Sequence, residues 1–183
     1  MGDNVPAMTE PKTVLRGSRV LLRPGTEADA PVVLGIRGEP EVRRWWRSPP
    51  PLEELTAELL GNDDDVQFVI VVDGEVAGLV QYGEETDPDY RHASIDVFLS
   101  ARVHGRGLGT ETVAVLAAYL IDVRGHHRLT IDPAAANSAA IRAYSKAGFR
   151  PVGLLRRYER GEDGEWHDGL LMDLLAGDLV RAE

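Results

Sequence analysis

The chain has 183 residues, 43% of them hydrophobic, which suffices for one folded domain with its own core and argues against a disordered tract. It contains no cysteine, which excludes disulfides, thiolate nucleophiles and cysteine-ligated zinc, and no apolar run is long enough to cross a bilayer. Its formal net charge of −10 repels nucleic-acid phosphates and anionic membranes and favours a cationic partner, although acidity for solubility alone explains the charge equally well.

The N-terminal end of the chain is polar. Residues 1–12 lack the apolar core of a signal peptide, so we expect a cytoplasmic protein. We expect residues 1–17 to form a flexible lead-in and residues 18–183 to form a single domain, because no linker, repeat or low-complexity tract interrupts the rest of the chain.

The first third of this domain predicts one strand and two helices. Residues 18–24 form a short apolar run closed by a proline, which is typical of a strand, and a helix over 26–37 follows with a threonine as its N-cap. A second helix is predicted over 52–60, after a run of three prolines. Trp45 and Trp46 lie between the two helices, and we expect them to be buried in the core rather than to line an acceptor site.

The hydrophobic pattern then changes to the period of β-strands. Residues 67–72 and 75–82 are β-rich runs separated by an Asp-Gly dipeptide, which is a strong hairpin signal. A third run over 91–100 places apolar side chains on one face and Asp96 on the other, because side chains alternate along a strand.

The second half of the chain mixes helices and strands. A glycine-rich stretch, 104–109, precedes a helix that we expect to reach residue 123. The remaining segments are predicted to be a strand over 128–131, a helix over 138–147 capped by Asn137, and an antiparallel strand pair over 149–159 and 166–174. This order predicts one α+β domain around a largely antiparallel sheet.

The glycine-rich stretch has the features of an anion-binding turn. Gly105, Gly107 and Gly109 let the backbone approach a ligand closely, and the first amides of the following helix point outward with a favourable dipole. Arg102 and Arg106 can add charge-assisted contacts to a phosphate. The spacing is not that of a dinucleotide-binding fold and lacks the Gly-Lys-Ser/Thr of a P-loop, so a plain tight turn is the alternative.

Two longer matches give this turn a more specific meaning. The run His104–Thr110, HGRGLGT, resembles the acetyl-CoA pyrophosphate loop of the GNAT acetyltransferase superfamily, with a histidine where that family has Gln or Arg. The run Asp132–Phe149 resembles the second half of the same family's core. The family's asparagine commonly hydrogen-bonds the pantetheine arm and its tyrosine lies near the coenzyme sulfur, so the resemblance assigns these roles to Asn137 and Tyr144.

The resemblance implies a fold, a donor and a set of contacts. The fold is the GNAT fold, a mixed and mostly antiparallel central sheet with helices on both faces and a splayed central strand pair. The donor is acetyl-CoA, whose arm lies in the gap between those strands, bonded to the main chain. No metal is expected, because no HExxH pattern occurs. The cofactor-binding residues it implies are Val97, Phe98, Leu99, His104, Gly105, Arg106, Gly107, Leu108, Gly109, Thr110, Asn137 and Tyr144.

A third match concerns the acceptor. The run Glu84–Pro88, EETDP, followed by Ser94-Ile-Asp96, is similar to a run in aminoglycoside 6′-N-acetyltransferases, which are antibiotic-resistance enzymes. It implies a cationic small-molecule amine as partner, with the 6′-amine of an aminoglycoside as acceptor. The substrate-binding residues it implies are Glu84, Glu85, Asp87, Asp96 and Asp132. A solvated acidic loop and a simple Asp-Pro turn are the structural alternatives.

Direct acetyl transfer needs a base for the amine and a proton for the leaving thiolate. We expect Asp96 to accept the amine proton, directly or through water, as the matching residue of the resembling family does. We expect Tyr144 to protonate the thiolate, because it lies seven residues after Asn137 and shares its helix face. The alternatives are a strand-edge hydrogen bond for Asp96 and core packing for Tyr144.

Other functions stay open beside the leading one. The acceptor can be a protein N-terminus or a small amine metabolite, or the domain can be a non-catalytic acyl-CoA-binding sensor. A nucleic-acid binder is disfavoured, since the net charge is negative and no basic aromatic stripe occurs. Dimers are common in the family, which leaves a homodimer open.

Overall fold

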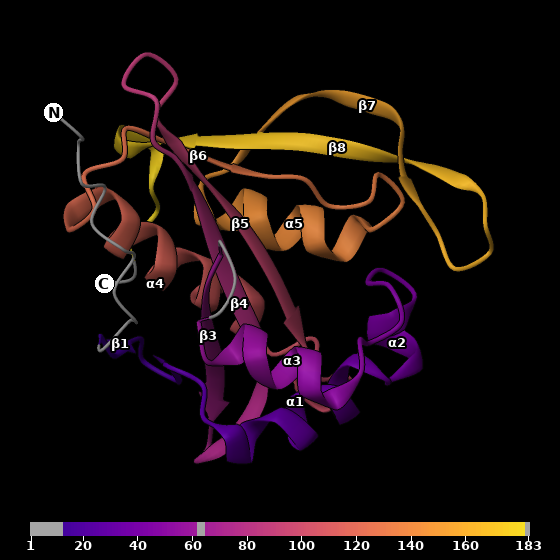
Figure 1. Ribbon diagram of the computed structural model, residues 1–183. Coiled ribbons are helices and arrows are strands. Elements are labelled where there is room, and N and C mark those ends of the chain that lie inside the picture. Colours follow the sequence, from indigo (N-terminus) through magenta and orange to yellow (C-terminus); the bar gives the residue numbers. More distant parts are fainter. Residues whose placement is uncertain (1–12, 62–64, 182–183) are drawn as a thin grey trace, which may run out of the picture.

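The computed structural model describes residues 13–61 and 65–181 as one eight-stranded sheet with helices on both faces (Figure 1). The strands are β1 (Leu15–Arg16), β2 (Val20–Arg23), β3 (Val66–Val72), β4 (Glu75–Glu85), β5 (His92–Leu99), β6 (Arg128–Ile131), β7 (Arg150–Arg160) and β8 (Trp166–Leu175). The helices are α1 (Ala30–Arg37), α2 (Pro40–Arg43), α3 (Leu52–Leu59), α4 (Leu108–Asp122) and α5 (Ser138–Ala147). The spatial order of the strands is β1-β2-β3-β4-β5-β6-β8-β7.

The pair β5 and β6 lies at the centre of the site and differs from the other pairs. It is parallel, whereas every other neighbouring pair in the described sheet is antiparallel. The two strands pair only at Ala93 with Leu129 and at Ser94 with Thr130. Beyond Ser94, β5 stays paired with β4 but leaves β6, which confirms the expected mixed sheet with a splayed central pair.

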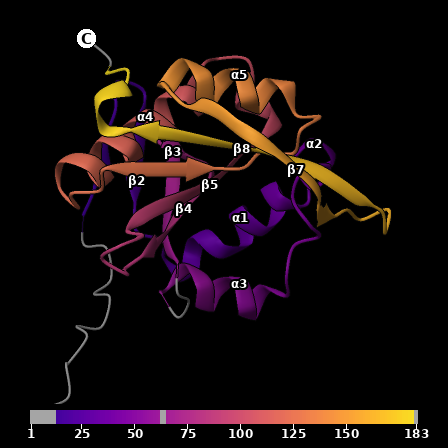
Figure 2. The same ribbon diagram turned by 90° about the horizontal axis from the view of Figure 1, so that it is seen from above.

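Each face of the sheet is covered by a pair of helices. Figure 2 shows α4 and α5 on one side of the sheet and α1 and α3 on the other. Along β3, Phe68 and Ile70 pack into the core under α4, while Val69 packs into the core that includes Val33 of α1 and Leu55 of α3. Because both faces are buried, β3 and β4 read as nearly continuous apolar runs rather than as alternating ones.

Most elements occur where the sequence predicts them, with three differences. The strand β4 extends to Glu85, and the short helix α2 was not expected; Pro40 supplies its first position, where proline is well tolerated. The expected flexible lead-in lies outside the described residues up to residue 12. Its last part is wrong as a prediction, because Leu15–Arg16 pair with Leu21 and Leu22 as β1.

The described residues contain neither a candidate membrane span nor a candidate metal-binding cluster. No helix within residues 13–61 and 65–181 is long and apolar enough to cross a membrane. Within those ranges there is also no group of three or more His, Cys, Asp or Glu side chains placed to hold a metal ion.

Candidate active site

A cavity of about 540 Å³ opens where β5 leaves β6. The end of β5, the glycine-rich turn, the start of α4 and the inner face of α5 form its walls. The structure brings together at this cavity the following predicted cofactor-binding residues: Val97, Phe98, Leu99, His104, Gly105, Gly107, Leu108, Gly109, Thr110, Asn137 and Tyr144. Segments 40 residues apart in sequence therefore share one concave surface.

The turn at the mouth of the cavity has the backbone shape of an anion cradle. Gly105 has a φ of 72° and Gly107 a φ of 77°, a left-handed conformation that L side chains rarely adopt. The amides of Gly105, Gly107 and Gly109 donate to no carbonyl of residues 13–61 or 65–181. The α4 helix begins at Leu108, so the dipole of a 15-residue helix adds positive potential at these free donors. The turn can therefore hold a diphosphate through its main chain.

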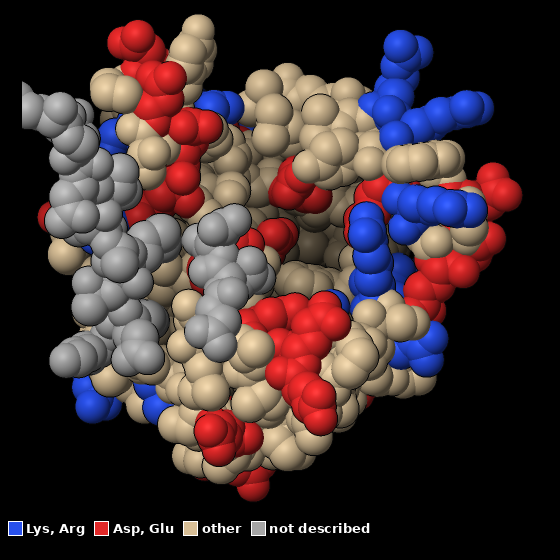
Figure 3. Space-filling model, viewed as in Figure 1, with Lys and Arg blue, Asp and Glu red and all other residues tan. Residues whose placement is uncertain are grey.

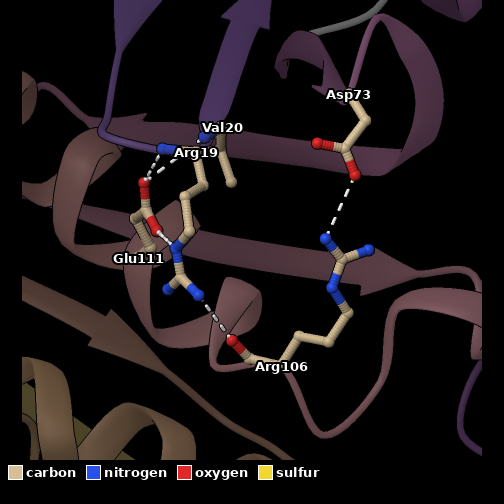
Figure 4. Close-up of polar contacts among 5 residues, drawn as sticks. All are labelled: Arg19, Val20, Asp73, Arg106 and Glu111. Carbon is tan, nitrogen blue, oxygen red and sulfur yellow. Dashed lines mark hydrogen bonds and ion pairs between the residues drawn. The ribbon is translucent and has the colours of Figure 1, made fainter.

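A strut from the first hairpin fixes this turn from outside (Figure 4). The Nη1 of Arg19 donates to the carbonyl of Arg106 at 2.8 Å, and its Nε pairs with Glu111 of α4 at 2.8 Å. The backbone amide of Arg19 also donates to Glu111, at 2.6 Å. Arg106 itself pairs with Asp73 at 3.1 Å and does not line the cavity. The guanidinium of Arg106 is therefore paired with Asp73 at the surface, and its expected contact with the cofactor stays a prediction.

His104 departs from the family pattern, and its side chain is used within the protein. Its Nε2 lies 2.8 Å from the carbonyl oxygen of Leu99, so the imidazole joins the end of β5 to the turn. His104 still borders the cavity. The main-chain amides of the turn, rather than the residue in the Gln/Arg position, are therefore the donors that the protein leaves free for a phosphate.

The α5 helix supplies the other wall. Asn137 caps it by accepting a hydrogen bond from the amide of Ala140 at 3.1 Å, as the sequence predicts. Tyr144 is buried, and its burial followed by the charges of Asp96 and Asp132 raises its pKa. The same helix adds two cations that sequence reasoning missed, Arg142 and Lys146, both of which line the cavity. Their helical spacing to Asn137 and Tyr144 was the signal that could have found them.

Asp96 sits at the end of a polar row that crosses the sheet. Gln67 on β3, Gln81 on β4 and Asp96 on β5 are direct register partners, so their side chains share one face. Gln67 Nε2 donates to Gln81 Oε1 at 3.2 Å, and Gln81 Nε2 donates to Asp65 at 3.2 Å. A further side-chain hydrogen bond joins Gln81 to Asp96. The row fixes the position of the Asp96 carboxylate.

The environment of Asp96 raises the pKa of its carboxyl group toward neutral pH. Asp96 is exposed and does not line the cavity, but the surrounding protein partly desolvates its carboxylate. Burial, followed by the charges of Asp132, Asp65 and Glu159, raises the pKa of Asp96 to about 6, against a smaller opposing effect of Gln81. Perturbed carboxylates in clefts are common at functional sites. Asp65 and Glu159 were not identified from the sequence.

A bulge in β7 brings Tyr158 to this acidic cluster. Pairing with β8 shifts between Leu155 and Glu159, and Arg157 within the bulge has a φ of 51°. The amide of Arg157 donates to Asp168 at 2.7 Å, which holds the bulge. Tyr158 hydrogen-bonds Asp132, and this bond, followed by burial, raises the pKa of Tyr158 to about 12. A strained non-glycine residue is a frequent feature of functional sites, but bulges cannot be located in a single sequence.

The acidic run at the end of β4 does not join this cluster. Glu84 lies three register pairs from Asp96, about 10 Å along the strand. Its carboxylate is almost fully buried against Arg124 and His126, at 2.6 Å from each. Glu85 and Asp87 accept backbone hydrogen bonds within their own loop. None of the three lines either of the two cavities, and neither do Asp96 and Asp132. The ion pairs of Glu84 give it a structural role, and the expected substrate contacts of Glu84, Glu85 and Asp87 stay predictions.

A second cavity, of about 670 Å³, adjoins the first. The segment after α2 and the β7–β8 hairpin enclose it, and Arg44, Trp45 and Trp46 line both cavities. Trp46 also packs edge-on against Phe98 with ring centroids 4.8 Å apart. We expected the two tryptophans to be buried in the core, but the structure places them at a cleft. Figure 3 shows the hollow on this face, with acidic and basic side chains around it.

Comparison with known proteins agrees with this geometry. Residues 19–150 match the family described as the acetyltransferase (GNAT) domain. The sequence is 30% identical over 153 residues to aminoglycoside N(6′)-acetyltransferase type 1 of Klebsiella pneumoniae, which covers 73% of this chain and 75% of that protein. It is 28% identical over 158 residues to spermidine N(1)-acetyltransferase of Escherichia coli strain K12, with 84% of each covered.

Two solved structures carry the comparison into three dimensions. RimJ of Mycobacterium smegmatis in complex with CoA-disulfide superposes with a TM-score of 0.79 at 25% identity, covering 93% of this chain and 89% of that one. The aminoglycoside acetyltransferase AAC(6′)-Ib in complex with ribostamycin and coenzyme A superposes with a TM-score of 0.72 at 26% identity, covering 88% of this chain and 96% of that one.

Proposed function

Since the chain belongs to the GNAT acetyltransferase family, we propose that it transfers the acetyl group of acetyl-CoA directly to a primary amine bound as a cation beside Asp96 and Asp132. One observation carries this proposal. A cavity with a main-chain anion cradle at its mouth lies next to a carboxylate cluster with a base of pKa about 6. Donor and acceptor thus meet at the splayed strands.

The residues of the cavity fit the donor. The free amides of the glycine turn suit its diphosphate, and the unpaired edge of β5 at Val97–Leu99 offers main-chain groups to its pantetheine arm. Arg142 and Lys146 supply positive charge on the same wall. When bound, acetyl-CoA supplies the acetyl carbonyl and a thiolate leaving group.

Three tasks then fall to the protein. Asp96, ionised above about pH 6, accepts the proton of the bound ammonium, directly or through one water. A backbone N–H group of Val97, Phe98 or Leu99 that faces the gap donates a hydrogen bond to the carbonyl oxygen as charge develops on it. Tyr144, whose raised pKa keeps its phenol protonated, donates its proton to the leaving sulfur. Holding amine and acyl carbon together supplies much of the acceleration.

The acceptor is the finer part of the proposal. The 6′-amine of an aminoglycoside is the acceptor class that similarity favours, as in an antibiotic-resistance enzyme, and a polyamine is the next. Both are cations that suit Asp96 and Asp132. A second class, a peptide N-terminus or small amine metabolite, is favoured by the arginines of the second cavity, which a polycation leaves unused.

Coenzyme release measured with a panel of acceptors tests the proposal. The panel contains kanamycin, spermidine and short peptides with free N-termini. We expect turnover with at least one primary amine and its loss in Asp96→Asn, with unchanged binding of acetyl-CoA. Tight acetyl-CoA binding without turnover of any of these amines would instead make the domain a non-catalytic acyl-CoA sensor.

A further inference from the structure

The second cavity is lined by equal numbers of arginines and carboxylates, but most of its arginines have no ion-pair partner among the described residues. Its lining includes four arginines, of which Arg43 pairs with Glu162 at 2.9 Å. Arg44, Arg47 and Arg160 form no ion pair with any residue in 13–61 or 65–181. Arg44 lies over the ring of Trp45 at 4.7 Å, and Arg160 donates to the carbonyl of Gly164 at 3.0 Å.

The carboxylates of this cavity are mostly engaged already. Glu162 accepts from Arg43 and Ser48, and Asp163 lies 2.9 Å from the imidazole of His167. Asp168 accepts from the backbone amide of Arg157. Glu159 is the exception, and it lies close enough to Asp96 for its charge to contribute to the raised pKa of that residue.

Glu159 therefore lies between a group of carboxylates and a group of arginines. At one end lie Asp96, Asp132 and Asp65, whose mutual repulsion shows an excess of negative charge. At the other end lie the unpaired arginines, in a chain whose formal net charge is −10. In Figure 3 basic side chains gather to the right of the hollow, with acidic ones among them, and the acidic side chains alone occupy much of its remaining rim.

We propose that the second cavity is a subsite for an anionic group of the acceptor, with a primary amine at Asp96 and a carboxylate between Arg47 and Arg160. Guanidinium groups bind carboxylate and phosphate in a planar, two-pronged geometry, and tryptophans line the same cavity. The cavity volume of about 670 Å³ suits a small acceptor of short-peptide size. This inference rests on the proposed acetyl transfer and makes its acceptor an ampholyte rather than a polycation.

Matched peptides test the subsite. Ala-Gly-Glu-amide and Ala-Gly-Gln-amide share the N-terminal amine and differ only in one carboxylate, and a phosphoserine peptide of the same length tests phosphate. We expect kcat/KM to be about tenfold higher for the Glu peptide, mainly through KM, since one charge-assisted pair with arginine is formed. The same ratio is expected in the dissociation constants, measured calorimetrically with the CoA-bound protein.

Variants assign the effect to the cavity. Arg47→Gln and Arg160→Gln should each reduce the Glu/Gln ratio severalfold, and the double variant should abolish it, with KM for acetyl-CoA unchanged. Arg16→Gln, on the exposed face of β1, is the matched control and should keep the ratio.

The outcomes separate this inference from the proposed function. Equal dissociation constants for the two peptides, or turnover of kanamycin or spermidine in preference to the Glu peptide, overturn the subsite and leave acetyl transfer standing. Absence of turnover with every amine overturns the proposed function, while the two dissociation constants still decide whether the arginines bind an anion.

Discussion

At the residue scale, Asp96 is the group whose environment differs most from that of an ordinary surface carboxylate. Its neighbours Asp132, Asp65 and Glu159 oppose its ionisation, and Gln81 alone among the named groups favours it. A carboxylate of pKa about 6 is a better proton acceptor than a free one and is still ionised near pH 7. The charge of Asp96 is therefore the property that a mutation or a change of pH should alter.

Replacing Asp96 by asparagine removes the base and keeps the shape. We expect Asp96→Asn to lower kcat by about 100- to 10,000-fold, the usual contribution of a positioned base, with KM for acetyl-CoA near that of the wild type. Because the folded-state pKa is raised, the ionised group destabilises the fold. The variant should be more stable than the wild type at pH 8 in urea titrations, and the difference should vanish as pH falls through 6 toward 4.

The pH dependence of the reaction provides the second prediction. The acid limb of kcat/KM should have an apparent pKa of about 6, well below the ionisation of the acceptor amine. Gln81→Leu removes the hydrogen bond that lowers the pKa of Asp96, so the limb should move to higher pH. Gln67→Leu, one strand further away, should move it less. A limb that stays in place or moves to lower pH in Gln81→Leu contradicts the assignment.

At the scale of elements, the turn between β5 and α4 combines a strained backbone with external support. Two of its glycines have positive φ, and Arg19 ties it to Glu111 and to the carbonyl of Arg106. Through these contacts of Arg19, the β1–β2 hairpin, which is distant in sequence, supports the glycine-rich turn. A preorganised loop loses less entropy when a ligand binds.

Gly107→Ala tests the backbone at this turn. A Cβ there meets only ordinary contact with Arg19 at 3.6 Å, so its penalty is the left-handed φ of 77°, about 1–2 kcal/mol. We expect weaker acetyl-CoA binding and lower stability, measured by calorimetry and thermal unfolding. Gly35→Ala in α1 is the control, since a Cβ at Gly35 meets nothing and alanine favours the helix. An unchanged affinity in Gly107→Ala would show that the turn does not hold the donor.

At the scale of the whole molecule, carboxylates form two separate clusters with different partners. The chain is acidic overall, yet the acids of one face divide between a cleft cluster around Asp96 and a structural cluster around Glu84. In the second cluster burial opposes ionisation, but hydrogen bonds from Arg124 and His126 hold the pKa of Glu84 below its usual value. Carboxylates thus stabilise the fold around Glu84, whereas substrate binding is the role that we propose for those around Asp96.

Glu84→Gln separates these two uses. We expect the free energy of unfolding at pH 7 to fall by about 1–3 kcal/mol, because a buried charge-assisted pair is broken, while kcat and KM stay close to wild type. The wild-type advantage is present above the ordinary glutamate pKa and should disappear as pH falls through the lower folded-state value. A large rise in acceptor KM with unchanged stability would restore the sequence-based assignment of Glu84 to the substrate.

The sequence by itself determined the order of elements, the glycine turn and the Asn137 cap, because these depend on periodicity and local backbone chemistry within a few residues. The catalytic roles assigned to Asp96 and Tyr144 stay predictions. Only the tertiary structure decided which acids gather around Asp96, because that depends on strand register across β3, β4 and β5. It likewise showed Glu84 in a buried ion pair and added Tyr158 to the acidic cluster, since the contacts of a side chain on a central strand or inside a bulge depend on segments that are distant in sequence.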